Sequence, residues 1–336
     1  MPRSLVTGGA GFMGSHVARE CIALGHDVVV VDDLSGGFLE NIPAGAEMVE
    51  ADVSDPAMVE DVFKRFSFDY VYHLAAYAAE GLSHFIRNFN YSNNIIGSVN
   101  LLNASINSGV RCFVFTSSIA VYGAGQVPMK EEMEPRPEDP YGIAKYAVEM
   151  DLEAAHRMFD IDYVIFRPHN VYGEGQNIAD RYRNVIGIFM NQIMRNEPMT
   201  VFGDGEQKRA FSYIGDIAPI IARSVDEKGA FNKIFNVGAD IPYSVNELAR
   251  TVARAFDVSA NIVHLPPRKE VVDAYSSHER LRDVFGEFPS TSLENGIAGM
   301  AAWAQEIGPR SPSSFGSIEV TKNLPPSWSS VAPIRQ

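Results

Sequence analysis

The alternation of short apolar segments with helix-like segments constrains the fold of this chain more than any other feature. Each short segment is rich in valine, isoleucine or aromatic residues and is almost continuously apolar, as strands buried on both faces of a parallel sheet are. We therefore predict an α/β fold, a doubly wound parallel sheet. The predicted strands are Ser4–Thr7, Asp27–Val31, Glu47–Glu50, Tyr70–His73, Cys112–Thr116 and Tyr163–Arg167, and the helices between them are roughly Phe12–Leu24, Ala57–Phe66, Asn90–Asn107 and Tyr141–Met158.

A glycine-rich turn between the first strand and the first helix indicates a dinucleotide site of the Rossmann type. Gly8, Gly11 and Gly14 stand three residues apart in LVTGGAGFMGSHVA. Glycine allows a sharp turn and the close approach of a pyrophosphate, which then lies on the amides of the helix N-terminus. The next strand ends in Asp32, a carboxylate placed to accept hydrogen bonds from an adenosine ribose. Because no arginine follows in LSGGFLEN to hold a 2′-phosphate, we predict NAD rather than NADP.

The ends of two later strands supply further candidate residues for the cofactor site. Asp52 ends the third predicted strand and could meet the adenine amino group, whereas Asp55, just before Pro56, is the better helix N-cap. The fourth strand ends in HLAA, whose small residues allow a ribose or nicotinamide to come close. Tight packing alone predicts the same alanines.

The strand–helix rhythm loosens after residue 169, which suggests a division of the chain. We predict a Rossmann domain over residues 1–169, to which some later segments return, and a smaller C-terminal α/β domain over 170–306, mainly for substrate. Residues 307–336 contain seven serines and five prolines without periodicity. We expect that tail to be extended or disordered.

Composition narrows the class of protein. A formal charge of −14 argues against general nucleic-acid binding, which needs a basic surface. No apolar run reaches the ~18 residues of a membrane span, and the N-terminus has no signal-peptide shape. Cys21 and Cys112 are expected to be buried thiols rather than a disulfide, which favours the cytoplasm. No residues are assigned to a metal.

The stretch DPYGIAK carries the candidate chemistry. Asp139 is placed as an N-cap and Pro140 as the first helical residue, so Tyr141 and Lys145 share one helix face. A phenol titrates at about 10, and a nearby ammonium together with a positive nicotinamide lowers its pKa. The pair would then act as a general base near neutral pH. A bare YxxxK pattern is more often a surface contact, so its context decides.

Together, these motifs make the chain resemble the extended short-chain dehydrogenases/reductases. The similarity is to their nucleotide-sugar epimerases and dehydratases and extends to about residue 305. It is carried by TGGAGFMG, HLAA, FTSSIAVYG, YGIAK, RPHNVYG and VFGDGEQKRAFSY. The resemblance implies an isomerase, an NAD-dependent UDP-sugar 4-epimerase.

The resemblance also assigns roles to individual residues. It makes Ser118 the serine that orients the sugar 4-hydroxyl, Tyr141 the base and Lys145 its partner, which also binds the nicotinamide ribose. The cofactor-binding residues that it implies are Gly8, Gly11, Phe12, Met13, Gly14, Asp32, Asp33, Asp52, Val53, Leu74, Ala75, Ala76, Asn94, Ser117, Tyr141, Lys145 and Pro168. The substrate-binding residues that it implies are Ser118, Asn170, Val185, Phe202, Arg209, Arg268 and Arg87.

Two positions depart from the family pattern. Ala210 stands where the family usually has an aspartate after the arginine. Arg268-Lys269-Glu270 replaces a usual arginine, any residue, glycine and acid, so Glu270 stands out of register.

The residues between Ser118 and Tyr122 separate the reaction classes of this family. A 4,6-dehydratase has an aspartate–glutamate pair where this chain has Ile119 and Ala120, a nucleotide-sugar decarboxylase has glutamate in place of Ala120, and a fucose-type epimerase/reductase has cysteine there. Alanine transfers no proton. The resemblance therefore implies oxidation and re-reduction at C4 alone, which gives a C4 epimer and regenerates NAD.

The identity of the sugar stays open between two candidates. UDP-glucuronate to UDP-galacturonate is favoured because His84, Arg87, Arg181 and Arg183 lie in segments that border the sugar and are able to meet a carboxylate. Glu80 argues against a uronate if it points inward. UDP-glucose/UDP-galactose is the alternative.

Two other functions remain as alternatives. One is a dehydrogenase/reductase that releases NADH, and the other is a non-catalytic NAD-binding Rossmann protein. A pure binder would not need Ser118, Tyr141 and Lys145, all of which are present. By analogy, the helices around 90–107 and 141–158 predict a homodimer.

Overall fold

The computed structural model describes residues 1–183, 185–267, 271–311, 315–325 and 328. Within this part of the chain, one parallel sheet has the strand order β11-β6-β5-β4-β1-β2-β3. The order reverses between β1 and β4, where the carboxyl ends of the strands open a crevice for a ligand. The strands are β1 (Arg3–Thr7), β2 (Asp27–Asp32), β3 (Glu47–Glu50), β4 (Tyr70–His73), β5 (Cys112–Thr116), β6 (Asp162–Pro168) and β11 (Lys233–Val237).

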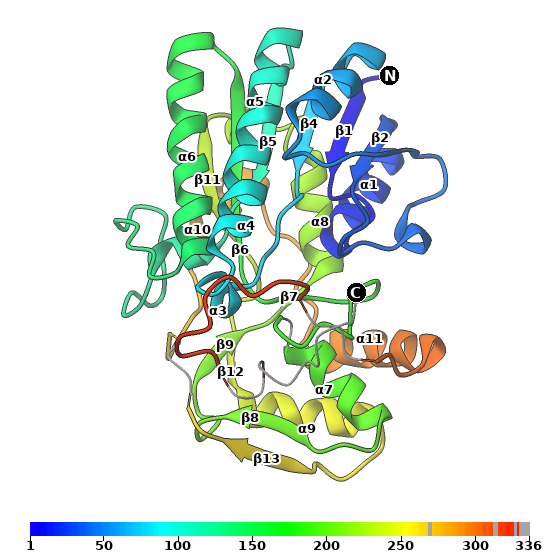
Figure 1. Cartoon of the computed structure of the whole chain (residues 1–336), viewed down its shortest axis with the longest axis vertical. Coiled ribbons are helices and arrows are strands. Elements are labelled where there is room, and N and C mark those ends of the chain that lie inside the picture. Colours follow the sequence, from blue (N-terminus) through cyan, green and yellow to red (C-terminus); the bar gives the residue numbers. More distant parts are fainter. Residues whose placement is uncertain (184, 268–270, 312–314, 326–327, 329–336) are drawn as a thin grey trace.

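Helices cover both faces of this sheet, as the predicted fold class requires (Figure 1). One face packs against α1 (Phe12–Ala23), α8 (Ile214–Arg223) and α10 (Glu279–Phe285). The other packs against α2 (Pro56–Arg65), α5 (Gly97–Ser108) and α6 (Pro140–Phe159). The doubly wound prediction is confirmed, and the predicted strands agree with the observed ones to within a residue or two.

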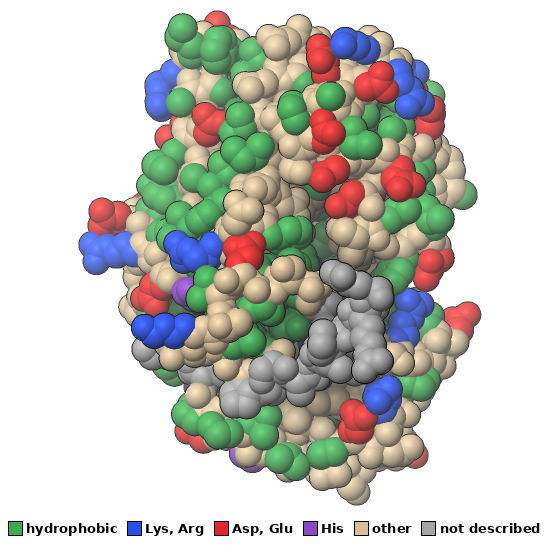
Figure 2. Space-filling view, viewed as in Figure 1, with side chains coloured by type: hydrophobic (Ala, Val, Ile, Leu, Met, Phe, Trp, Pro, Cys, Tyr) green, Lys and Arg blue, Asp and Glu red, His purple; other side chains and the backbone are tan. Residues whose placement is uncertain are grey.

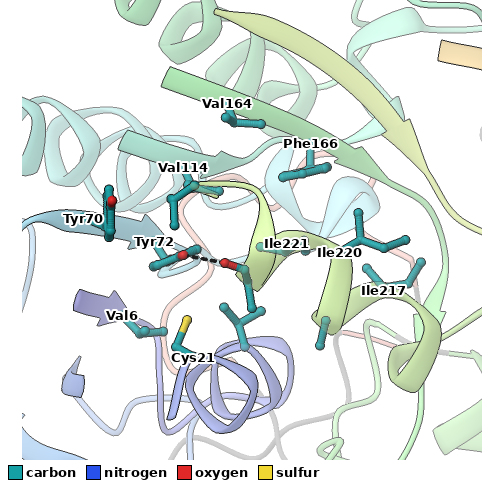
Figure 3. Packing of buried hydrophobic residues seen from close by; sticks show 14 of the residues in the cluster. Val6, Cys21, Tyr70, Tyr72, Val114, Val164, Phe166, Ile217, Ile220 and Ile221 are labelled. Atoms are coloured by element: carbon teal, nitrogen blue, oxygen red, sulfur yellow. Dashed lines mark hydrogen bonds between the residues drawn. The ribbon is translucent and has the colours of Figure 1, made fainter. Parts of the chain in front are cut away.

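The core beneath α1 and α8 shows how the sheet is closed on one face (Figure 3). Tyr72 from β4 lies beside Cys21 of α1, and its hydroxyl donates a 2.6 Å hydrogen bond to the carbonyl of Ala222 at the end of α8. Cys21 and Cys112 are both buried and free, as predicted. Burial raises the pKa of the Cys21 thiol to about 12, so it is inert at neutral pH.

The predicted helix over Asn90–Asn107 is wrong as a single regular helix. The chain instead forms α3 (Glu80–Ser83) and α4 (Arg87–Tyr91), then a π-helical turn η2 (Ser92–Ile96), and only then α5. A π turn widens the helix locally and is common near functional sites. Here it places the buried side chain of Asn94 against the loop that follows β4.

The smaller lower part of the molecule is built from helices and two-stranded sheets around its own core (Figure 1). Its helices are α7 (Val185–Met194), α9 (Val245–Ala255) and α11 (Leu293–Ile307). Its paired strands are β7 (Val171–Tyr172) with β10 (Ser212–Tyr213), β8 (Met199–Phe202) with β13 (Ile262–Leu265), and β9 (Lys208–Ala210) with β12 (Pro242–Ser244); short 3-10 turns lie at η1 (Leu39–Asn41), η3 (Ile119–Tyr122) and η4 (Lys228–Ala230).

The described residues after α11 run as an extended chain across the front of the molecule (dark red in Figure 1). They are not loose, because Phe315, Ile318, Leu324 and Trp328 pack on an apolar cluster around Leu82. The described residues therefore fit the extended form of the prediction, and their docking on the fold was not predicted. No helix among the described residues is long and apolar enough to cross a membrane.

Candidate active site

A cavity of about 1170 Å³ lies between the carboxyl edge of the sheet and the smaller part of the molecule. Figure 2 shows the hollow from the front, with apolar side chains in its depth. Most of the residues predicted for the site line it: Gly8, Gly11, Phe12, Met13, Gly14, Asp32, Asp33, Asp52, Val53, Leu74, Ala75, Ala76, Ser117, Ser118, Tyr141, Lys145, Pro168, Asn170, Val185, Phe202 and Arg209.

Two of the predicted residues that the structure describes are not part of this wall. Arg87 is exposed, and its guanidinium lies over the Tyr91 ring at 5.9 Å instead of facing the cavity. Asn94 is buried behind the wall, where its side chain accepts from the Tyr77 amide at 2.9 Å and donates to the Tyr77 carbonyl at 3.3 Å. Arg268 lies outside the described residues.

The glycine-rich turn is sterically closed to larger residues. Gly8 has φ +70°, and a Cβ on it would lie 2.7 Å from the Ala75 nitrogen. A Cβ on Gly14 would lie 2.0 Å from the Gly8 carbonyl oxygen, well inside any real contact. Helix α1 begins here without a side-chain cap and without an acidic residue in its first turn. Its first amides are therefore open to an anionic group in the cavity.

Asp32 stands at the end of β2 with its carboxylate fixed by the main chain. It accepts hydrogen bonds from the amides of Ala10 at 3.0 Å and Leu34 at 2.9 Å. Burial raises its pKa, although these bonds act in the opposite direction. Asp52 accepts from the Ser54 amide on the cavity wall, and Asp55 caps α2 through the amides of Ala57 and Met58, as predicted.

The three hydroxyls at the end of β5 have different surroundings. Ser118 accepts a 3.1 Å hydrogen bond from the Ala120 amide, and its hydroxyl also meets the Tyr141 phenol. Ser117 donates to the buried carboxylate of Glu149. The Thr116 hydroxyl is buried on the cavity wall and has no hydrogen-bond partner within the described part of the chain. An orphaned hydroxyl at this place suits a bound polar ligand.

Tyr141 and Lys145 lie on one face of α6, which Asp139 caps through the Gly142 amide at 2.9 Å. The Lys145 ammonium is 5.8 Å from the centre of the Tyr141 ring and donates a 2.8 Å hydrogen bond to the Thr116 carbonyl. Burial lowers the pKa of Lys145 to about 7, which Glu149 partly opposes. Burial raises the pKa of Tyr141, and Glu80 adds to that effect. The expected lowering of the phenol pKa is therefore not a property of these side chains by themselves.

A buried ion pair beneath the site was missed by the sequence reasoning. Glu149, one helical turn after Lys145, binds Arg167 of β6 through two hydrogen bonds of 2.9 and 2.5 Å. The Arg167 guanidinium lies 4.7 Å over the ring of Tyr122, whose hydroxyl donates to Asn236 at 2.8 Å. Since Glu149 also accepts from Ser117, this network connects α6 to the ends of β5, β6 and β11. The sequence feature that could have indicated this ion pair is a glutamate four residues after Lys145, on the same buried face of the helix.

The far end of the cavity carries the residues predicted for the nucleotide. Val185 and Phe202 contribute apolar surface to it. Arg209 donates to the carbonyls of Val271 and Val272, which directs its guanidinium across the cavity rim. Asn170 has φ +41° and donates to the carbonyl of Ala210, the residue that replaces the usual aspartate.

Charged side chains on the cavity wall differ in how firmly they are held. Arg183 pairs with Asp180 at 2.6 Å and lies 4.6 Å over the Tyr77 ring. Arg181 lines the cavity and has no ion-pair partner within the described part of the chain. Glu80 and His84 belong to the same region of the wall.

A scan against protein-family models matches residues 4–238 to the NAD dependent epimerase/dehydratase family. This chain belongs to that family. The match spans the sheet, the glycine-rich turn, the Ser118–Tyr141–Lys145 group and the cavity between them. The family predicted from the sequence is confirmed. Because this family is NAD dependent, the prediction of NAD as the cofactor is confirmed as well.

The chain is similar to named members over nearly the whole length of each. It is 34% identical to a putative UDP-glucose 4-epimerase of Methanocaldococcus jannaschii, over 89% of this chain and 97% of the relative. The solved UDP-glucose 4-epimerase of Thermotoga maritima with UDP-glucose is 34% identical with a TM-score of 0.85, covering 91% of this chain and 99% of its own. The UDP-glucuronic acid 4-epimerase of Bacillus cereus, solved with UDP-glucuronic acid and NAD, is 25% identical with a TM-score of 0.83 over 91% and 99%.

The residues present fit the cofactor of this family. The uncapped N-terminus of α1 suits the pyrophosphate, the buried Asp32 suits the adenosine ribose, and Lys145 with the orphaned Thr116 hydroxyl lies at the opposite end. No cluster of possible metal ligands exists among the described residues.

Proposed function

We propose that this chain is a UDP-sugar 4-epimerase whose preferred substrate is UDP-glucuronate, converted to UDP-galacturonate through a 4-keto sugar. The observation that carries the proposal is that Ser118, Tyr141 and Lys145 line the same cavity as the glycine-rich turn, with the Lys145 ammonium 5.8 Å from the centre of the Tyr141 ring. An acid–base pair and a hydride acceptor in one cavity suffice for reversible oxidation of an alcohol.

The side chains divide the reaction between them. NAD, when bound, accepts the C4 hydride and later returns it. Ser118 orients the sugar 4-hydroxyl, and Tyr141 takes its proton as the carbon–hydrogen bond breaks. The Lys145 ammonium stabilises the phenolate from below the ring. After the keto sugar has turned, Tyr141 gives the proton back to the opposite epimer.

The absence of a second acid restricts the outcome to epimerisation. Neither Ile119 nor Ala120 carries a group that moves a proton, and the Ala120 amide donates a hydrogen bond to the Ser118 hydroxyl. Elimination of water across C5 and C6 or loss of the C6 carboxylate would need such a group.

A positive charge on the cavity wall favours a uronate. Arg181 lines the cavity without an ion-pair partner within the described part of the chain, so its charge is available to a C6 carboxylate. The similarity to the Bacillus cereus enzyme supports the same choice. Higher identity to the glucose enzymes and the acid at Glu80 favour the alternative, UDP-glucose/UDP-galactose.

Proton NMR of the purified protein with each sugar, and no added NAD, tests this choice. We expect the anomeric signal of UDP-galacturonate to grow faster from UDP-glucuronate than that of UDP-galactose from UDP-glucose. Arg181→Gln should slow the uronate reaction about tenfold more than the glucose reaction. Arg87→Gln is the matched control, since Arg87 faces away from the cavity. Faster turnover of UDP-glucose would move the assignment to the neutral sugars.

The remaining alternatives are separated by Tyr141→Phe. An epimerase should lose about 10²- to 10⁴-fold in turnover and keep its bound NAD. A non-catalytic NAD-binding protein would be unaffected in its function, and a dehydrogenase would release NADH in proportion to product.

We propose further that the chain forms a homodimer through α5 and α6, which stand side by side on one flank (Figure 1). Ile143 and Met150 of α6 are 41% and 48% exposed and lie two turns apart on one face. Ile96, just before α5, adds a third exposed apolar side chain. Apolar surface gathered on two adjacent helices suits a subunit interface.

A further inference from the structure

The described residues after α11 extend beyond the last helix of the fold. The Thermotoga maritima and Bacillus cereus structures are matched over 99% of their length, yet each leaves about a tenth of this chain unmatched. Residues 308–336 make up a stretch of that size. Its described part nevertheless reaches the cavity.

Two polar contacts fix this segment on α4. The Glu319 carboxylate accepts hydrogen bonds from the amides of Asn88 at 2.7 Å and Phe89 at 2.9 Å. Helix α4 has no side-chain cap of its own, so Glu319 supplies one from 230 residues away in sequence. The amides of Glu319 and Val320 both donate to the Phe85 carbonyl, at 2.8 and 3.1 Å.

Aromatic rings continue the attachment toward the cavity. Phe315 packs on Phe89 with ring centres 4.9 Å apart and on Tyr77 at 5.2 Å. Trp328 packs edge-on against Tyr182 at 5.2 Å and Phe85 at 5.9 Å. Trp328 is 5% exposed and lines the cavity together with Tyr77 and Tyr182.

This wall belongs to the catalytic end of the cavity. Ser83 of α3 donates to the Glu80 carbonyl at 2.6 Å and accepts from the amide of Tyr141 at 3.3 Å. A Cβ on Gly81 would lie 3.3 Å from the Trp328 ring. Trp328 therefore covers the helix that is bonded directly to the catalytic tyrosine.

We propose that Trp328 is a substrate-binding residue, and that the C-terminal segment holds it as the outer wall of the sugar pocket. This inference rests on the proposed epimerase function. A 4-keto sugar has to turn within the site before the hydride returns, and it must not leave during that time. An aromatic wall confines a pyranose by apolar contact without requiring one orientation of its hydroxyls, so both epimers are held.

Loss of the aromatic wall should leave a detectable chemical product on the enzyme. Oxidation of C4 moves one hydride to NAD and one proton to Tyr141, and the reverse step consumes both. If the keto sugar escapes in between, the enzyme is left with bound NADH and stops. Weaker confinement should therefore appear as absorbance at 340 nm on the protein, in addition to slower turnover.

The first experiment uses Trp328 as its own reporter. The chain has two tryptophans, and Trp303 of α11 is partly buried against the core of the smaller part and does not line the cavity. In Trp303→Phe, all tryptophan emission comes from Trp328. We expect UDP-glucuronate or UDP-glucose to change that emission strongly, and UDP alone, which lacks the hexose or uronate attached to the diphosphate, to change it little. Equal responses to UDP and to the UDP-sugars would overturn the placement of Trp328 at the sugar.

The second experiment removes the wall. Trp328→Ala and a truncation after Ser311 should raise KM for the sugar nucleotide by about tenfold and build up bound NADH during turnover. Glu319→Gln, which weakens the cap on α4, should give a smaller effect in the same direction. Trp303→Phe is the matched control and should turn over like the original protein.

The outcomes separate this inference from the proposed function. If the unaltered protein epimerises a UDP-sugar while Trp328→Ala and the truncation keep the same KM and form no NADH, the wall has no role and the inference is wrong. If the unaltered protein epimerises no UDP-sugar, the proposed function fails first, whatever the emission of Trp328 shows.

Discussion

At the scale of single residues, burial decides the chemistry of Lys145. Its ammonium is surrounded by Phe115, Tyr141 and the Thr116 carbonyl, and its pKa falls to about 7. The folded protein thus binds a proton on Lys145 less tightly than the unfolded chain, whose lysine keeps its ordinary pKa. Between these two values the unfolded state holds the extra proton, so stability rises with pH.

We accordingly predict a pH-dependent difference between the original protein and Lys145→Met. From pH 7 to pH 9 the original protein should gain about 2 kcal/mol of unfolding free energy relative to the variant. Urea unfolding of both proteins at the two pH values measures this gain. Lys64→Met, which alters an exposed lysine on α2, is the control and should show no such gain. Parallel pH profiles for Lys145→Met and the original protein would contradict the burial argument.

Glu149 and Arg167 test a second residue-scale claim. Both side chains are almost fully buried, so Glu149→Gln leaves the charge of Arg167 without its counter-ion. Removing one partner of a buried pair costs about 3–5 kcal/mol. Glu153→Gln, one turn further along α6, breaks only a 3.9 Å exposed pair with Arg157 and should cost under about 1 kcal/mol. Thermal unfolding compares them, and equal losses would show that the buried pair is not structural.

Single residues were predictable where the local pattern carries the chemistry. The glycines, Asp32, Asp139 and Tyr141 stand in short motifs whose spacing fixes their place in the fold. The Glu149–Arg167 pair was not visible, because its members belong to a helix and a strand that meet only after folding. Asn94 was assigned near the cofactor, but the π turn directs it to the main chain of Tyr77.

At the scale of elements, the turn between β1 and α1 is the feature that tolerates larger side chains least. Gly14→Ala would drive a Cβ of α1 into the Gly8 carbonyl of the turn before it, and a backbone oxygen cannot move aside as a flexible side chain can. We predict at least about a tenfold loss of NAD affinity, measured as NAD retained after purification and by titration calorimetry. Gly36→Ala is the control, since its Cβ would find only Arg183 at 4.0 Å. Unchanged NAD content in Gly14→Ala would contradict the cradle geometry.

Strands were easier to predict than helices for a physical reason. A strand buried on both faces must be apolar throughout, so β1, β2, β4 and β5 stand out in the sequence. The interruption of the helix over 87–108 depends on hydrogen bonds of Asn90 and Asn94 to distant backbone, at Pro140 and Tyr77. The two-stranded sheets of the smaller part are two to four residues long and leave too little periodicity to recognise.

At the scale of the whole molecule, the flank formed by α5 and α6 predicts assembly. Met150→Glu should convert a dimer into a 36.9 kDa monomer, as measured by light scattering after gel filtration. Val258→Glu places the same charge on a comparably exposed apolar residue beyond α9 and should leave the mass unchanged. A monomeric original protein, or a dimer that survives in Met150→Glu, would refute the proposed interface.

The contacts of the C-terminal tail could not be predicted from the sequence. Its serines and prolines are typical of chains without a core, and that composition gave no sign of docking. Its described apolar side chains and Glu319 nevertheless find partners in and around α3 and α4, and Trp328 also packs on Tyr182, all far earlier in the chain. Such contacts depend on a surface that exists only after the rest has folded.

The central claim is that the hydride taken from C4 of a UDP-sugar is returned within the same active site to the opposite face of C4. The most direct test is to supply UDP-glucuronate carrying deuterium at C4 in ordinary water and to analyse the epimer by NMR and mass spectrometry. We predict that the UDP-galacturonate formed keeps its deuterium at C4. Replacement of the deuterium by solvent hydrogen would show that the hydride is not returned within the site, and would contradict the mechanism.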